Sequence, residues 1–143
     1  MCIIVDANAA FELSNKTDDG MPVLQWLLNP RVKAGLIIGG KLAAELRGIK
    51  FSQVLLTLRR AGRLHIIPDQ RLKEKEQSLI TSGACRSNDV HVVALALATR
   101  CNVVFTRDVL LHADLRFNSV AGNRITIYQN ASHSHLLVEC RCI

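Results

Sequence analysis

The sequence predicts an α/β fold in which helices cover both faces of a mostly parallel central sheet of about five strands. Short, β-branched apolar runs alternate with helical patterns along the chain, and this order places a crossover helix between successive parallel strands. The 143 residues suit one domain, and the core is aliphatic, because 49% of the residues are hydrophobic but only 4% are aromatic. The low aromatic fraction also disfavours a protein that binds single strands by stacking bases.

Five short apolar runs are expected to form the strands. Each contains Val, Ile or Leu and is followed by a polar residue, glycine or proline, which is typical of strands that are buried on both faces. Their ranges are 2–5, 36–38, 64–67, 103–105 and 125–128. A sheet of this kind binds its ligands beyond the carboxyl ends of its strands.

The segments between these runs are expected to be helical. Pro30 ends one helix, and Gly62 closes another. The segment 89–100 is apolar nearly all round, so we expect a buried helix there, capped by Ser87 or Asn88. The expected helices are 7–13, 21–28, 41–47, 51–61, 69–80, 89–100 and 109–115.

The composition favours a cytoplasmic protein. The net charge of +6, from 18 basic and 12 acidic residues, suits contact with a polyanion but equally suits a solubilising surface. The five cysteines are an odd number without the dense spacing of a secreted disulfide framework, so a reducing compartment is expected. The apolar N-terminus meets Asp6 at once and is too short for a signal peptide, and no stretch approaches the length of a membrane span.

Four acidic residues are expected at the edge formed by the carboxyl ends of the strands. Asp6 and Asp108 follow strands, while Glu45 lies on the helix after the second strand and Asp89 opens the buried helix. Clustered carboxylates repel one another and lose hydration, so a fold that gathers them needs positive charge, most simply a hard cation with oxygen ligands. The pattern therefore predicts a site for Mg²⁺ or Mn²⁺.

Each acid also has a purely structural interpretation. Asp6 and Asp108 suit the N-cap positions of the helices that follow them, and Asp89 complements a helix dipole. Glu45 can pair with Lys41, one helical turn earlier. Because capping does not require every acid to appear at the same edge of the sheet, the joint pattern favours the metal site.

Four segments, taken in order, resemble the motifs of the PIN-domain nucleases, which include the VapC-like ribonuclease toxins of toxin–antitoxin pairs. The resemblance covers roughly the first 120 residues. No single motif is specific, but the four in order are fairly strong. The segments are Ile-Ile-Val-Asp-Ala-Asn at 3–8, Leu-Ala-Ala-Glu-Leu at 42–46, Asn-Asp-Val-His-Val-Val-Ala-Leu-Ala at 88–96 and Val-Val-Phe-Thr-Arg-Asp at 103–108.

The resemblance implies a three-layer PIN-like nuclease domain at residues 1–129 and a C-terminal tail at 130–143. It assigns Asp6, Glu45, Asp89 and Asp108 to metal binding and catalysis. The metal ions would activate a water for in-line attack on an RNA phosphodiester bond and stabilise the charge on the leaving oxygen. The implied partners are an RNA substrate, an antitoxin protein and a second copy of the chain in a homodimer.

Polar residues near these acids are candidates for substrate contact. Asn8 and Thr106 are the polar neighbours of the acids in the family picture. Arg86 and Arg107 lie near motif acids in sequence, so they either hold a substrate phosphate or pair with acids when the metal is absent. Basic residues on or beside the helices 41–47 and 51–61 either follow a phosphate backbone or form a solvated face: Arg47, Lys50, Arg59, Arg60 and Arg63.

The sequence departs from the family pattern after Asp108, where relatives often carry another acid and a Phe. Asp114 is therefore either a fifth metal ligand or a solvated acid near a helix end. The tail, outside the resemblance, holds the donor types of a zinc site, but their one-residue gaps favour a frayed or strand-like terminus: His133, His135, Cys140 and Cys142.

Two classes of function remain open on these patterns. The first is a metal-dependent endoribonuclease, and the second is a catalytically inactive PIN-like module that binds nucleic acid or a partner protein. The intact set of acids favours the enzyme. His91 is expected to be a hydrogen-bonded histidine in the core or at the crevice edge rather than a general base, because metal ions can supply the nucleophile.

Overall fold

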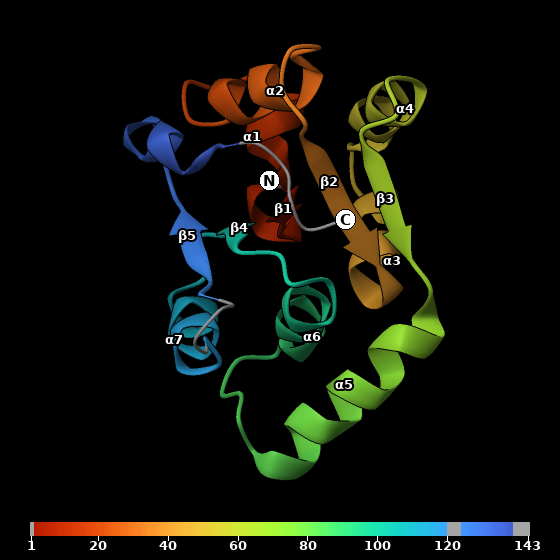
Figure 1. The fold of residues 1–143 in the computed structure, drawn as a ribbon, viewed down its shortest axis with the longest axis vertical. Coiled ribbons are helices and arrows are strands. Elements are labelled where there is room, and N and C mark those ends of the chain that lie inside the picture. The colour runs from red at the N-terminus through yellow and green to blue at the C-terminus, as the bar shows by residue number, and fades with distance from the viewer. Residues whose placement is uncertain (1, 120–123, 139–143) are drawn as a thin grey trace.

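The fold, seen in a computed structural model that describes residues 2–119 and 124–138, is built on a five-stranded sheet. The strands are β1 (Cys2–Val5), β2 (Gly35–Gly39), β3 (Leu64–Ile67), β4 (Val103–Phe105) and β5 (Thr126–Tyr128). Their order is β3-β2-β1-β4-β5, and every neighbouring pair is parallel (Figure 1). The predicted α/β class is confirmed, and the sheet is wholly rather than mostly parallel.

The helices also follow the predicted order, with shifts at their ends. The largest difference lies after β1, where the single helix expected at 7–13 is a 3-10 turn followed by a short α-helix. The elements are η1 (Ala7–Ala9), α1 (Ala10–Ser14), α2 (Met21–Leu28), α3 (Gly40–Gly48), α4 (Ser52–Arg60), α5 (Asp69–Ser82), α6 (Val90–Thr99), α7 (Val109–Phe117) and η2 (Ala131–Leu136). In the described part of the chain, no helix is long and apolar enough to cross a membrane.

The core lies around the three central strands. All residues of β1, β2 and β4 are buried, as continuous apolar runs in a parallel sheet require. The middle of α6, Val92–Ala96, is buried as well, which confirms the predicted buried helix. Val5 is in register with Phe105, and the Asp6 N–H donates to the Phe105 carbonyl at 2.9 Å, so the residues that follow β1 and β4 lie level at one edge.

The direction of the strands separates two ends of the molecule. In Figure 1, α2 and α4 lie at one end of the sheet, and α5 lies beyond the other, where β3 leads into it. Arg59 and Arg60 end α4 and so lie towards the amino end of β3, opposite the edge of the acids. Arg63 donates to the carbonyls of Val32 and Ala34, at 2.7 and 3.2 Å. A phosphate track from α4 to the acids is therefore not supported.

Two glycines set the start of α3. Gly40 has φ +53°, a left-handed conformation that glycine adopts at little cost. A Cβ on Gly39 would lie 3.0 Å from the Ile67 carbonyl oxygen and 2.9 Å from Leu72 Cδ1. This pair lets α3 begin directly at the end of β2, which brings Glu45 to the edge where the other acids lie.

Candidate functional site

Asp6 is a buried carboxylate at the end of β1. Only 3% of the residue is exposed; Oδ2 accepts a hydrogen bond from the Thr106 hydroxyl at 2.9 Å, and Oδ1 accepts one from the Ala7 N–H at 2.8 Å. Burial raises the pKa of Asp6, the two hydrogen bonds and His91 oppose that rise, and the charge of Glu45 adds to it. Asp6 is therefore both the N-cap of η1, as its structural interpretation predicts, and electrostatically coupled to its neighbours.

Asp108 likewise has a structural role. Its Oδ1 accepts hydrogen bonds from the N–H groups of Leu110 and Leu111, at 2.9 and 3.4 Å, so it is the N-cap of α7. The Asp108 N–H donates in turn to Thr106 Oγ1 at 3.2 Å. Thr106 thus links the two aspartates, because its hydroxyl donates to Asp6 and accepts from Asp108.

Asp89 differs from both, since it makes no capping hydrogen bond. It occupies the N-cap position of α6 itself, so the prediction that Ser87 or Asn88 caps this helix is wrong; instead, Ser87 Oγ accepts from the Asp89 N–H at 3.3 Å. The pKa of Asp89 is raised to about 6, first by burial, then by the charge of Asp6, and by a hydrogen bond with Asp108 and its charge. Three carboxylates from three elements therefore act on one another.

Glu45 joins this group from α3. Its Oε2 lies 3.2 Å from Nε2 of His91, and its Oε1 lies 3.9 Å from Nζ of Lys41, which confirms the predicted pair one turn apart. The helix α3 packs against both α6 and η1. The structure therefore places the four acids that the sequence singled out in one region, where Asp6 interacts electrostatically with Glu45 and Asp89, and Asp89 with Asp108. Asp6, Asp108 and Glu45 also have structural partners there.

The chemistry of these donors fits a hard divalent cation. All four side chains offer carboxylate oxygens, and burial together with the charges of Asp6 and Asp108 raises the pKa of Asp89, which a bound cation would reverse. Across residues 2–119 and 124–138, no three His, Cys, Asp or Glu side chains lie close enough together to hold a metal ion in the positions seen here. The acids thus form an open cluster, coupled by charge.

The four residues predicted to contact substrate have different surroundings. Thr106 is fully buried and holds Asp6, whereas Asn8 is exposed and its Oδ1 accepts from the Arg107 N–H at 3.2 Å. Arg107 Nη2 donates to carboxylates outside the predicted set, to Glu12 at 2.7 Å and to Asp19 at 3.2 Å. The fourth residue, Arg86, is exposed.

Asp114, the possible fifth ligand, is buried rather than solvated. Its Oδ1 accepts from the Arg86 N–H and its Oδ2 accepts from the Ser87 N–H, both at 2.8 Å. Burial opposes ionisation, but hydrogen bonds from Ser87 and Arg86 outweigh it and hold the pKa of Asp114 below its usual value. Asp114 therefore fixes the loop that leads into α6. The sequence offered no local signal for this role, because the partners are 27 and 28 residues away.

Two buried histidines lie in this region: His91, which confirms the expected hydrogen-bonded histidine at the crevice edge, and His112, for which the sequence made no prediction. His91 contacts Glu45 as described, and Nε2 of His112 lies 2.8 Å from the Thr106 carbonyl oxygen. Polar residues within largely apolar helices were the available signal, since a buried polar side chain needs a partner.

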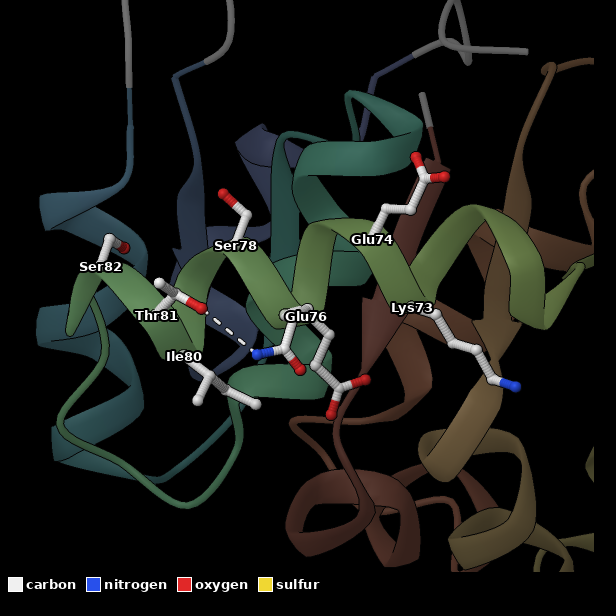
Figure 2. A pocket seen from close by; sticks show the side chains of 8 residues that line it. Lys73, Glu74, Glu76, Ser78, Ile80, Thr81 and Ser82 are labelled. Atoms are coloured by element: carbon white, nitrogen blue, oxygen red, sulfur yellow. Dashed lines mark hydrogen bonds between the residues drawn. The ribbon is translucent and has the colours of Figure 1, made fainter.

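Two features farther from the acids, a hollow along α5 and the C-terminal tail, contain none of the predicted site acids. A hollow with a cavity volume of about 910 Å³ runs along α5, and Gln77 donates to Thr81 there at 3.2 Å, the dashed line in Figure 2. All its lining residues come from that one helix and none is a predicted site acid: Lys73, Glu74, Glu76, Gln77, Ser78, Ile80, Thr81 and Ser82. In the tail, His133 Nδ1 accepts from the Gln129 N–H at 3.0 Å, while Cys140 and Cys142 lie outside the described residues.

Comparison with solved structures agrees with this architecture. No family model and no curated protein matches the sequence. A chain in the crystal structure of VapBC2 from Rickettsia felis, bound to a DNA fragment from their promoter, is 20% identical with a TM-score of 0.54; the match covers 90% of this chain and 100% of that one. A chain of VapBC-1 from nontypeable Haemophilus influenzae is 17% identical with a TM-score of 0.53, covering 90% and 98%. At these identities the likeness concerns the fold, and the chain has the three-layer, PIN-like fold that the sequence predicted.

Proposed function

We propose that this chain is a divalent-metal-dependent endoribonuclease of the PIN type and the toxin of a toxin–antitoxin pair. The observation that carries the proposal is that Asp6 and Asp108 both act on Asp89, whose pKa is raised first by burial and then by these two acids. These acids lie at the carboxyl edge of a parallel sheet, which is where such a fold binds ligands. The fold shared with chains of the two VapBC structures supports the proposal.

In this proposal Asp6, Glu45, Asp89 and Asp108 hold Mg²⁺ or Mn²⁺. The bound cation supplies an activated water and stabilises the charge that develops on the phosphodiester. The carboxylates act as ligands, and their own hydrogen bonds orient them. Thr106 holds Asp6, and the first turn of α7 holds Asp108 through its N–H groups.

The remaining predicted residues have distinct proposed roles. Thr106 is fully buried and so acts through Asp6 rather than by touching substrate. Arg86 and Asn8 are exposed next to acid-bearing segments and are proposed to contact the RNA. Arg107 is held by Glu12 and Asp19, so its contact with a phosphate requires exchange of these ion pairs.

The solved relatives are themselves VapBC assemblies, so we propose an antitoxin protein as a partner of this chain. A homodimer is proposed from the sequence resemblance, and a cytoplasmic location from the composition. Co-expression with the product of an adjacent small reading frame, followed by co-purification, tests the first proposal. Sedimentation of the purified chain alone tests the second.

One set of observations favours the alternative, an inactive PIN-like module that binds nucleic acid or a partner. Asp6 and Asp108 both cap helices, and Glu45 pairs with Lys41, so three of the four acids have structural partners without a metal. Asp89 separates the two functions, because it makes no capping hydrogen bond that its replacement would break.

The test is cleavage of a mixed RNA pool by the purified chain with Mn²⁺ or Mg²⁺, beside an EDTA control and Asp89→Asn. We expect cleavage that requires metal and is lost in Asp89→Asn, while that variant stays folded by circular dichroism. RNA binding without cleavage by the folded wild-type chain, across several substrates and both metals, would instead establish the inactive module.

A further inference from the structure

His91 is a buried polar side chain in an otherwise apolar helix. It is 6% exposed, and the five residues that follow it on α6 are apolar and buried. Placing an imidazole in such surroundings costs free energy unless a hydrogen bond compensates for the lost hydration. The compensating group is Glu45 of α3, whose Oε2 lies 3.2 Å from His91 Nε2. Because a carboxylate oxygen only accepts, His91 Nε2 is the donor.

The two partners of Glu45 differ in how firmly they hold it. Lys41 contacts Oε1 at 3.9 Å, and its side chain is 61% exposed on the same helix, so this ion pair is weak and mobile. The His91 side chain is 5% exposed and belongs to a different helix, so packing fixes its ring. A glutamate has three rotatable side-chain bonds, and a fixed donor on a neighbouring element restricts them most effectively.

We propose that His91 is a positioning residue, which holds the Glu45 carboxylate on the side of α3 that packs against η1 and α6 so that it is ready to bind the divalent cation. This inference rests on the proposed metal-dependent function and adds a residue to it. His91 acts through Glu45 alone: the hydrogen bond engages Oε2 and leaves Oε1 to the exposed Lys41, a contact that a cation can replace. Hydrogen-bond partners of metal ligands commonly contribute about 10- to 100-fold to metal affinity.

The experiment is calorimetric titration of the full chain with Mn²⁺, without RNA. We expect His91→Leu, which keeps the volume but removes the donor, to weaken Mn²⁺ binding by about 10- to 100-fold. His91→Gln, whose amide N–H replaces Nε2–H, should retain most of the affinity. Lys41→Ala removes the exposed partner of the same carboxylate and is the matched control, which we expect to bind almost as the wild type does.

A double-mutant cycle tests whether His91 acts through Glu45. In a Glu45→Gln background, His91→Leu should cause little further loss of affinity, because the carboxylate that it positions is absent. An undiminished loss in that background would overturn the inference, as would wild-type Mn²⁺ affinity in His91→Leu. Thermal unfolding in EDTA checks that each variant is folded.

Two further outcomes are distinguishable. If His91→Leu does not fold, the comparison passes to His91→Gln and His91→Asn; only the longer amide reaches Glu45, so equal Mn²⁺ affinities of these two would overturn the positioning role. If the wild-type chain itself binds no Mn²⁺, the proposed function and this inference fail together, whereas failure of the inference alone leaves wild-type binding intact.

Discussion

Two aspartates lie near the start of α6: Asp89 at its N-cap, and Asp114, which belongs to α7. Their surroundings shift the pKa of the same side chain in opposite directions. Asp114 is buried, and each of its oxygens accepts a backbone N–H, so its pKa is lowered. Asp89 makes no capping hydrogen bond and faces Asp6 and Asp108, so its pKa is raised to about 6. The supply of N–H donors, rather than burial alone, decides which acid stabilises the fold and which is left for a ligand.

The largest expected effect is on catalysis. Asp89→Asn removes a charge from the cluster and leaves the backbone hydrogen bonds in place, so the rate of metal-dependent RNA cleavage should fall by about a hundred- to a thousandfold. Cleavage rates at saturating Mn²⁺, measured for this variant and for Asp18→Asn on the exposed surface, provide the check. Equal losses of cleavage rate in the two variants would show that Asp89 contributes no more to cleavage than an exposed surface acid.

Asp114→Ala should lower the stability of the fold while leaving the cleavage rate largely unchanged. The change leaves the partly buried N–H of Arg86 and the buried N–H of Ser87 without their acceptors, at a cost of about 2–4 kcal/mol in the free energy of unfolding. Because the folded-state pKa of Asp114 is lowered, its contribution is present above the unfolded value of 3.8 and is lost as the pH falls through the folded one. Urea denaturation at pH 7 measures the loss, and cleavage well below the melting temperature should stay within a few-fold of wild type.

The smallest expected effect is a gain in the stability of the metal-free fold. Because the folded-state pKa of Asp89 is raised, its ionised form destabilises the metal-free fold above about pH 6, and Asp89→Asn should stabilise that fold by about 1 kcal/mol after allowance for solvent screening. The gain should shrink as the pH falls from 6 towards 3.8 and disappear below that value, where the carboxyl group is protonated in both states. Urea denaturation in EDTA at pH 7.5 and pH 5.0 tests this; an equal gain at both pH values would contradict it.

The sequence predicted the strands and the edge at which the acids gather, because both depend on local patterns. Apolar runs locate β1 and β4, and an acid that follows such a run lies at the carboxyl edge of any parallel sheet. The wholly parallel order also follows from helical crossovers, since each strand is separated from the next by at least one helix.

What escaped prediction depends on contacts between distant residues. The partner of His91 lies 46 residues away, and the partners of Arg107 lie 95 and 88 residues away, so no spacing rule identifies them. Capping was predicted correctly for Asp6 and Asp108 but not at α6, where the helix begins one residue later than a cap at Asn88 would require. Helix ends are decided by such single-residue competition.

The hydrogen bond between Thr106 and Asp6 has a consequence for the synthesis of the chain. It joins residues 100 positions apart, and β1 lies between β2 and β4 in the sheet. A growing chain that has released only its first half holds Asp6 and Glu45 but lacks the strand that completes the edge, and such long-range pairing forms late and slowly. The acid cluster therefore cannot assemble on a ribosome-bound chain until Asp108 has emerged, so translation itself delays the moment at which the protein acquires its site.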